Sequence, residues 1–476
     1  MHSARRWQRV LTLALVISFA AAACGGGGSG DDDSAADTGG TDETTETAET
    51  ADSQDIADSA DSAETGDTGD TGDEEPTASD VGVTADTLTI GYISADSSAL
   101  PDLPIILDVD EPEYGVAALV DDINERGGIN GRQIQLESFF WDPLDIPASL
   151  DAICLEAGQD NELFAVMTNT FFGDAVPCLA GDAGVPMLMA QTIPPGIVER
   201  SNGNVFVMEG IHDQLLVDAI TILGDEGFLD GKKIGVPIQI EPGQESLPDV
   251  IEEAVAPYDA TVEFFEIERV LFGTNPTIAA GAQAMSEAGI DLVLTANNSP
   301  TLFGLMTEAD LIGWSPTWLV SDLSEQTNLV VPTNAPAAQL ENVIGISANV
   351  TSGLDGVPAS TMEEQCIEFR NSIEGAEPID ERGSSAYTTY LHDACFLVLL
   401  MEDVLTASGV NPTRESFRAA TAEISPFETV AGGQASFGPD KAHAPDEYRI
   451  VEYSTTCPGA DNGCFTPTSD WIAAPR

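Results

Sequence analysis

The sequence predicts an α/β protein of two Rossmann-like lobes, each with a parallel sheet covered by helices. Three observations predict this fold class. Segments with strand-like alternation and segments with helical spacing follow one another through residues 87–321. Strands that alternate with helices imply parallel sheets with right-handed crossovers. About 400 residues follow position 80, which is too long for one such sheet and fits two lobes.

The first series of elements predicts lobe one. Val116, Leu119, Val120 and Ile123 share one helical face, and Gly127-Gly128 is expected to end that helix. The expected strands are 87–94, 132–140, 163–168 and 185–191, the expected helices are 114–126, 150–157 and 174–181, and 205–210 is expected to cross between the lobes.

The pattern then restarts and predicts lobe two. The expected helices are 216–223, 247–254, 277–288 and 300–312, and the expected strands are 233–240, 261–267, 291–296 and 317–321. In such sheets ligands bind at the carboxyl ends of the strands. Two lobes that face one another at these ends predict a cleft.

The chain is strongly acidic, with 81 Asp and Glu residues against 16 Lys and Arg residues and a formal charge of −65. Such a chain repels phosphate backbones and anionic lipid, so we expect no nucleic-acid partner and no polybasic membrane contact. A solvated acidic surface suited to a salty medium explains the charge most simply. The alternative is a surface that binds a cationic partner.

Residues 1–23 have the features of a secretory signal peptide. Arg5, Arg6 and Arg9 precede an apolar segment, 10–20, that is too short for a permanent membrane helix. Three alanines then lead to Cys24, an arrangement that resembles a bacterial lipobox. That resemblance implies cleavage before Cys24 and a diacylglyceryl group on its thiol. Ordinary signal cleavage beside a chance cysteine is the alternative, and the residues around the arginine pair fit twin-arginine export poorly.

Residues 24–80 are predicted to be the lipidated cysteine followed by a disordered acidic tether. From residue 25 to residue 80 there are 19 acidic residues, no basic residue, and Ile56 as the only large apolar side chain. Such a segment buries too little apolar surface to offset the entropy of ordering it. A flexible coil of this length spans roughly 40 Å. The expected location is extracytoplasmic, with the lipid as the only membrane anchor.

Six cysteines remain after Cys24, an even number that suggests three disulfides in an exported chain. Six cysteines allow 15 pairings, and we expect the local ones because the members of each pair lie on consecutive helices or flank one turn-rich loop. The expected pairs are Cys154–Cys178, Cys366–Cys395 and Cys457–Cys464. No C-x₂-C spacing occurs and only four His are present, so neither a metal site nor a cofactor is expected.

Three segments carry a resemblance to a known family. GVTADTLTIGYIS, GVAALVDDINERGGINGRQIQL and SFGPDKAHAPDEYRIVEY resemble segments of the solute-binding proteins of branched-chain amino acid (leucine/isoleucine/valine) ABC importers. The resemblance implies a type I periplasmic-binding fold, in which two lobes joined by a three-segment hinge close on a ligand. The implied lobes are 81–208 with 349–425, and 211–345 with 428–476.

The same resemblance implies a solute site at the strand ends. Thr168, Asn169 and Thr170 form the first loop, and Ala190, Gln191 and Thr192 form the second. In the family, a small hydroxyl residue and an Ala-x-Thr at these two loops hold the solute carboxylate. In lobe two, Asn297 and Asn298 end one strand, and Asp322 ends the next where the family often places an acid facing an ammonium group. Asn at strand ends also serves in turns and helix caps, which is the competing interpretation.

Two departures from the family matter. Relatives often have an aromatic residue after the first strand of lobe two, whereas this chain has residues 241–244, Glu-Pro-Gly-Gln. This makes an ordinary branched-chain amino acid a weaker candidate. The segment 95–112 is long and acidic, and it either favours a cationic ligand or is simply solvated.

The sequence therefore predicts a monomeric lipoprotein that delivers a small polar solute, amino acid or amide-like, to the permease of an ABC importer. The alternatives are a ligand-sensing receptor module without transport and a surface lipoprotein that binds no solute. No G-x-S-x-G, P-loop lysine motif or H-E-x-x-H occurs, so no enzyme is expected. His392 is expected to pack inside a helical core.

Overall fold

The computed structural model describes residues 75–96, 113–239, 244–270, 275–350, 352, 354, 358–373, 379, 387–388, 390–457 and 460–475. The predictions for the signal peptide, Cys24, the tether up to residue 74 and most of the acidic segment 95–112 lie outside these residues. None of the described helices is long and apolar enough to cross a membrane.

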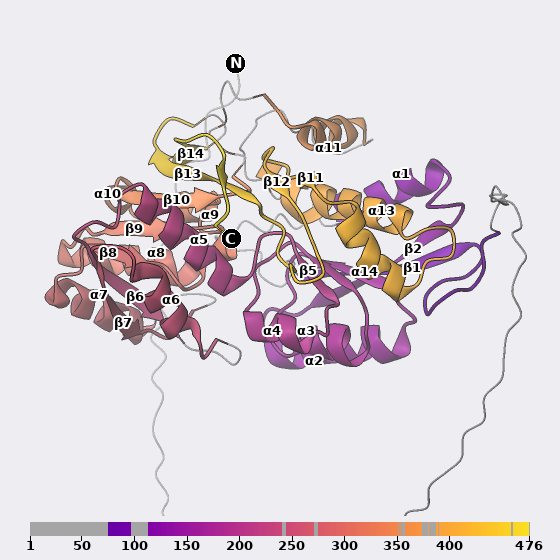
Figure 1. The fold of residues 1–476 in the computed structure, drawn as a ribbon, viewed down its shortest axis with the longest axis horizontal. Helices are drawn as coiled ribbons and strands as arrows, with labels where there is room; N and C mark the ends of the chain where they lie inside the picture. The colour runs from indigo at the N-terminus through magenta and orange to yellow at the C-terminus, as the bar shows by residue number, and fades with distance from the viewer. Residues whose placement is uncertain are drawn as a thin grey trace, which may run out of the picture. The chain divides into compact units, whose positions relative to one another are not determined.

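A five-stranded parallel sheet forms the first lobe, in the order β2-β1-β3-β4-β5 (Figure 1). Its strands are β1 (Thr87–Ala95), β2 (Gln133–Trp141), β3 (Ala165–Thr168), β4 (Met187–Met189) and β5 (Val205–Val207). The helices in the same segments are α1 (Ala118–Glu125), α2 (Ile146–Leu155), α3 (Ala175–Pro177) and α4 (Pro195–Arg200). Later segments add α11 (Thr361–Ser372), α13 (Leu397–Ala407), α14 (Arg414–Glu423) and a small sheet of β11 (Phe427–Glu428) and β12 (Gln434–Ala435).

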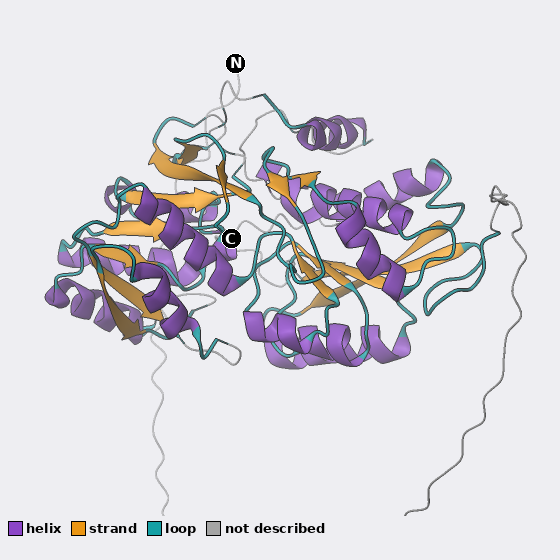
Figure 2. Ribbon diagram, viewed as in Figure 1, coloured by secondary structure: helices purple, strands orange, loops and turns teal. Residues whose placement is uncertain are grey.

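A second sheet contains the path β14-β13-β10-β9-β8-β6-β7, and helices cover it as they cover the first (Figure 2). Its strands are β6 (Lys233–Ile238), β7 (Thr261–Glu266), β8 (Leu292–Leu294), β9 (Thr317–Val320), β10 (Val343–Ser347), β13 (Glu447–Ser454), β14 (Cys464–Pro467) and β15 (Ile472–Ala473). Its helices are α5 (His212–Asp225), α6 (Leu247–Val255), α7 (Pro276–Ala288), α8 (Ser299–Ile312), α9 (Val330–Asn334) and α10 (Ala337–Leu340). Strands β6 to β10 are parallel, and β13 is antiparallel to β10.

The chain passes between the two sheets three times: after β5, after β10 and before β13. At the third passage the segment around His443 lies beside β5. Val207 N donates to Ala442 O (2.7 Å), and Ala444 N donates to Val207 O (2.8 Å). The predicted two-lobed α/β class with a three-segment connection is confirmed.

The expected crossing segment 205–210 is partly wrong, because Val205–Val207 form the fifth strand of the first sheet. All three of these residues are buried. They pair with β4 and form the last strand of the sheet. Only the residues after Val207 make the passage to α5.

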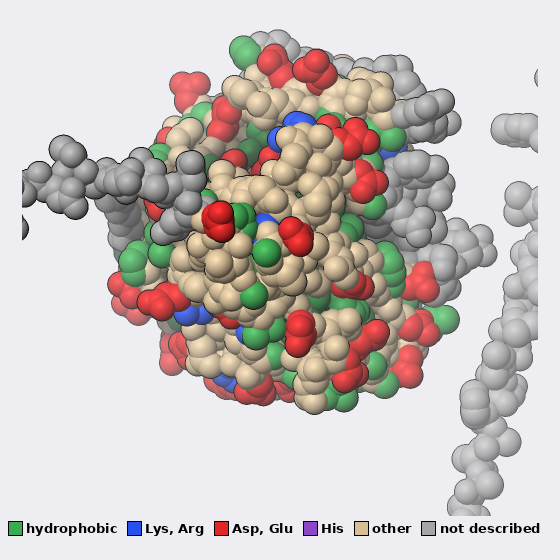
Figure 3. Space-filling model, turned by 90° about the vertical axis from the view of Figure 1, so that its right-hand side faces the viewer, with side chains coloured by type: hydrophobic (Ala, Val, Ile, Leu, Met, Phe, Trp, Pro, Cys, Tyr) green, Lys and Arg blue, Asp and Glu red, His purple; other side chains and the backbone are tan. Residues whose placement is uncertain are grey.

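Acidic side chains are scattered over the molecular face shown in Figure 3, and only a few basic side chains lie among them. This distribution agrees with the composition of residues 81–476, which hold 62 acidic and 13 basic side chains. The carboxylates are spread apart in solvent, where repulsion between neighbours is weakest.

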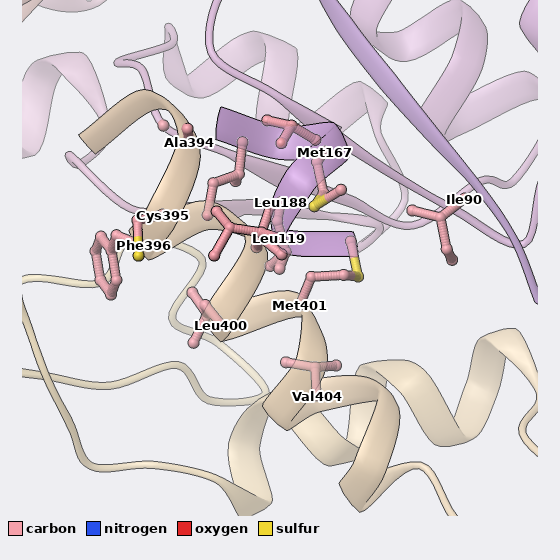
Figure 4. Close-up of a cluster of buried hydrophobic side chains, with 14 of the residues drawn as sticks. Ile90, Leu119, Met167, Leu188, Ala394, Cys395, Phe396, Leu400, Met401 and Val404 are labelled. Atoms are coloured by element: carbon pink, nitrogen blue, oxygen red, sulfur yellow. The ribbon is translucent and has the colours of Figure 1, made fainter. Parts of the chain in front are cut away.

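Apolar clusters lie on both faces of the first sheet. Strands β3, β4 and β5 are buried at every position, whereas the edge strand β2 mixes buried and exposed residues. Strand β1 alternates between two clusters of apolar side chains. Leu88, Ile90 and Tyr92 belong to the cluster that includes α1, α13 and α14, and Ile93 belongs to the one that includes α2 and α3. Figure 4 shows part of the first cluster, with Ile90, Met167 and Leu188 of the strands near Leu400, Met401 and Val404 of α13.

Local sequence signals fix several helix ends. Asn275 accepts a hydrogen bond from Thr277 N at the start of α7, and Ser360 forms a capping box with Glu363 at the start of α11. Gly289 and Gly313 end α7 and α8 in the left-handed conformation (φ 68° and 71°), which glycine adopts without strain.

The described residues hold three disulfides, and they join the pairs that the sequence predicts. The Cα–Cα distances are 6.2 Å for Cys154–Cys178, 5.8 Å for Cys366–Cys395 and 5.9 Å for Cys457–Cys464. The first two tie neighbouring helical segments of the first lobe, and the third closes the turn between β13 and β14.

The last residues of the expected tether are bound to the first lobe. Thr77 N donates to Asn411 Oδ1 (2.8 Å), Ser79 Oγ donates to Pro412 O (2.6 Å), and Arg414 N donates to Asp80 Oδ2 (2.7 Å). The fully buried Arg132 donates to Thr77 O (2.8 Å). The acidic segment therefore ends as part of the folded lobe, because backbone and side-chain groups there meet specific partners.

Candidate functional site

A cavity of about 580 Å³ lies where the carboxyl ends of strands from both sheets meet. Its wall includes the residues that end or follow β1, β2, β3 and β4 in the first lobe, and β6, β8 and β9 in the second. Parallel strands bring their carboxyl ends to one edge of a sheet, which is why loops far apart in sequence converge here.

Six of the nine predicted site residues line this cavity. They are Asn169, Thr170, Gln191, Thr192, Asn297 and Asn298. Four of them follow β3 and β4 in the first lobe, and the last two follow β8 in the second lobe.

The first-lobe loops are held by hydrogen bonds within the lobe. Thr170 Oγ1 accepts from Ala95 N (3.0 Å) and donates to Asn169 Oδ1 (3.2 Å). Gln191 accepts from Phe171 N (2.6 Å) through Oε1 and donates to Phe171 O (2.8 Å) through Nε2. Gln191 therefore braces the loop after β3 with both ends of its amide.

Thr192 connects the two lobes. Ser324 N donates to Thr192 Oγ1 (3.3 Å), and both residues line the cavity. Since Thr192 follows β4 and Ser324 follows β9, this bond spans the cavity rim between the two sheets.

The two asparagines of the second lobe also perform structural tasks. Asn297 Nδ2 donates to Pro237 O (2.9 Å), and Asn298 Nδ2 donates to Val270 O (2.8 Å). Asn298 Oδ1 accepts from Thr301 N (3.3 Å) and caps α8. Both asparagines therefore serve in turns or helix caps, as the competing interpretation expects, and both also line the cavity.

Thr168, Ala190 and Asp322 do not line the cavity. Thr168 and Ala190 are buried within the sheet edge. Asp322 is 3% exposed, and its carboxylate accepts from Thr327 Oγ1, Ser347 Oγ and Ala348 N (2.7 Å for the last). Burial raises the pKa of Asp322, and these donors oppose the shift. The structure thus places Asp322 behind the wall, where it holds β9 and β10 together, instead of on the surface that meets a solute.

An aromatic pair that sequence reasoning missed forms part of the wall. Trp141 ends β2, and its ring lies 5.5 Å from the ring of Phe172 at an interplanar angle of 87°, an edge-to-face contact. Trp141 Nε1 donates to Thr170 O, so the ring is fixed to the loop after β3. The sequence signal is the position of Trp141 at the carboxyl end of a strand.

The charged wall residues were also missed. His212 and Glu209 come from the passage between the lobes and the start of α5, Arg269 follows β7, and Glu325 follows β9. Asp174 pairs with Arg200 (2.9 Å). Gln244, the last residue of the four that replace the family's aromatic, lines the cavity and is buried.

Buried titratable residues also lie outside the cavity, among them Asp218 and His392. His392 is buried, and burial lowers its pKa to about 4, which fits a packing role. Among the described residues, no group of three or more His, Cys, Asp or Glu side chains is placed to hold a metal ion.

Two α/β lobes, three connecting passages and a cavity at facing strand ends define a protein that encloses a small solute. The profile of the family described as periplasmic binding protein matches residues 87–458. The chain belongs to this family, whose members are solute-binding proteins that work outside the cytoplasm.

Solved structures of substrate-binding proteins share the fold. The fatty acid ABC transporter substrate-binding protein from Thermomonospora curvata has a TM-score of 0.60 at 14% identity, covering 84% of this chain and 95% of its own. The p-hydroxybenzoic acid complex from Rhodopseudomonas palustris HaA2 has a TM-score of 0.60 at 14% identity, covering 82% and 98%. The branched-chain amino acid protein from Thermus thermophilus with bound valine has a TM-score of 0.58 at 14% identity, covering 82% and 97%. No curated protein matches the chain in sequence.

Proposed function

We propose that this protein captures a small carboxylated solute between its lobes and delivers it to the permease of an ABC importer. The observation that carries the proposal is the cavity at the facing strand ends, lined from both sheets and bridged by the bond from Ser324 N to Thr192 Oγ1. A ligand held by both lobes binds the closed arrangement more tightly than an open one, and that difference is what a permease reads.

The wall provides groups for both parts of such a solute. The Asn169 amide and the Thr192 hydroxyl supply donors for a carboxylate, and Trp141 and Phe172 supply apolar surface for its body. Valine, p-hydroxybenzoic acid and a fatty acid, which the similar structures name, are all carboxylic acids. This shared group supports a carboxylated solute.

We further propose how the protein is held and divided. Residues 1–23 direct export, Cys24 carries the lipid, and the acidic tether links it to a monomeric body. Lobe one comprises 81–208 and 349–444, and lobe two comprises 211–345 and 445–476. The boundary at 428 that the sequence predicts moves to about 445, because Val430, Ala435, Phe437 and Ala444 pack in the apolar cluster of the first lobe. The position of Cys24 after an apolar segment and three alanines supports the anchor, and the separate sheets support the division.

The test is thermal melting of the purified protein with a panel of amino acids, amides, aromatic acids and short fatty acids. A solute at 100 times its Kd should stabilise the protein by about 2.7 kcal/mol, a shift of a few degrees.

Two cavity variants and two control variants test whether the solute binds in the cavity. Trp141→Ala and Thr192→Val should reduce the shift, whereas Trp471→Ala and Thr307→Val, whose side chains lie outside the cavity, should preserve it. A shift that survives both cavity substitutions would place the solute elsewhere, and no shift with any compound would contradict solute capture.

A further inference from the structure

His212 lines the cavity at the point where the chain enters the second lobe. It is the first residue of α5, a helix of 14 residues, and its backbone N donates to Ile193 O (3.0 Å) of the first-lobe loop. This backbone bond holds His212 at the passage between the two lobes, where the residue lines the cavity.

The imidazole of His212 forms no hydrogen bond with any residue that the structure describes. The residue is only 8% exposed, and Nδ1 is buried without a partner. Asp213 Oδ1 lies 3.6 Å from Nδ1, which is beyond hydrogen-bond length. A buried polar group without a partner is costly, so such groups usually meet a ligand or an ordered water.

The surroundings of His212 favour an acidic ligand group. The cap residue Ile211 has no side-chain acceptor for the first turn of α5, and the N-terminal end of a helix attracts negative charge. An imidazole carries at least one N–H donor, whichever of its nitrogens holds the proton.

The group that would receive an ammonium in an amino acid binder is occupied. Asp322 is enclosed and accepts from Thr327, Ser347 and Ala348. Asp174 of the wall pairs with Arg200. Glu209 and Glu325 also line the cavity together with Arg269, and they are the acids on which a cationic solute would have to rely.

We propose that His212 donates a hydrogen bond to an acidic group of the solute, and that this solute is an organic acid without an ammonium group. The apolar body of the acid packs against Trp141 and Phe172. The inference rests on the proposed function, because it concerns the same cavity.

The test uses two sets of compounds that share a body and differ only in charge. Hydrocinnamate, L-phenylalanine and phenethylamine have the aromatic body, and isocaproate, L-leucine and isoamylamine have the branched one. Binding to the purified full chain is measured by calorimetry at neutral pH. The acid of at least one set should bind at least tenfold tighter than the amino acid, and the amine should not bind.

His212→Phe tests the residue, because it keeps a ring and removes the donor, and His443→Phe is its matched control because His443 borders a different cavity. His212→Phe should weaken binding of the acid by tenfold or more, as expected for loss of a bond to a charged group. His443→Phe should bind like the parent, and circular dichroism should show both variants folded.

Three outcomes would overturn the inference. Tighter binding of L-phenylalanine, L-leucine or either amine would show that an ammonium is recognised, and an unchanged affinity in His212→Phe would remove the residue from the site. Either of these two results would overturn the inference but would leave the proposed function intact. Failure of all six compounds, of valine and of p-hydroxybenzoate to bind would contradict the proposed function as well.

Discussion

Asp322 shows that a strand-end acid can hold a binding wall in place without touching the solute. Its carboxylate joins the turn after β9 to the end of β10 through Thr327, Ser347 and Ala348. Asp322 directly precedes the turn Leu323–Glu325, which brings Ser324 and Glu325 to the cavity. The residue therefore acts on the site through the position of its neighbours.

Asp322→Ala is expected to destabilise the protein by about 3 kcal/mol, because it leaves buried donors without an acceptor. Chemical denaturation of the variant and the parent measures this. Asp310→Ala, in the surface-exposed part of α8, is the control and should change the free energy of unfolding little. A variant as stable as the parent that binds no solute would restore Asp322 to the site.

Asp218 is a second buried carboxyl group with a measurable consequence. It lies in α5 and is fully buried, and Gln214 Nε2 donates to its Oδ1 (2.8 Å). Burial raises the pKa of Asp218 to about 6, against the opposing hydrogen bond from Gln214. The folded protein therefore holds this proton at pH values where the unfolded chain has lost it.

The contribution of Asp218 to stability falls as the pH rises from about 4 to about 6, because the folded state binds more protons in that window. Asp218→Asn keeps the neutral form at all pH values. The variant should exceed the parent in free energy of unfolding by on the order of 2 kcal/mol at pH 7.5, with a smaller advantage at pH 5.0. Urea unfolding at both values checks this, with exposed Asp151→Asn as control. Equal stability of variant and parent at pH 7.5 would contradict it.

At the scale of elements, the disulfides restrain helices that are short or irregular. Cys154 lies in α2, and Cys178 directly follows α3, a helix of three residues. Such a helix has little stability of its own, so the covalent link to α2 helps to keep the segment in place beneath the first sheet.

Replacing both Cys154 and Cys178 by Ser should lower the free energy of unfolding by about 3 kcal/mol, since the link closes a loop of 24 residues' separation. Replacing Cys457 and Cys464, separated by 7, should cost less, about 2 kcal/mol. Denaturation under non-reducing conditions compares the two double variants. A larger loss for the second pair would show that loop length does not govern their effect.

The pattern of apolar residues predicted most elements, because the strands form short runs of apolar or alternating residues and the helices bury one face. β1 and α1 follow their patterns closely. β5 was predicted as a crossing because three apolar residues are too few to establish a period. Strand order also brought Asn169, Thr170 and Thr192 together correctly. His212, Arg269 and Phe172 also line the cavity. Their place there depends on the conformation of loops, which the local spacing of apolar residues does not predict.

At the scale of the whole molecule, charge is the dominant feature. The formal charge is −65, and residues 81–476 alone hold 62 acidic and 13 basic side chains. Few of these acids can find a basic partner, so each repels its neighbours through solvent. Self-repulsion of this kind opposes the compact state, and dissolved salt weakens it.

Raising sodium chloride from 0.05 M to 1 M should therefore raise the melting temperature by several degrees, because the screening length falls from above 10 Å to about 3 Å. Caesium chloride should act similarly, since screening depends on charge and not on the identity of the cation. A melting temperature that stays constant or falls with salt would show that the acidic surface does not destabilise the fold.

Residues 75–80 are attached to the first lobe at the edge of its sheet opposite the cavity. These residues bind beside Arg132 and Asn411, where β1 and β2 begin, and the cavity opens where β1 and β2 end, at Ala95 and Trp141. Nine-residue strands put these edges roughly 26 Å apart. A pull transmitted through residues 75–80 therefore reaches the first lobe alone, at the edge of its sheet opposite the cavity, and does not act directly on the second lobe.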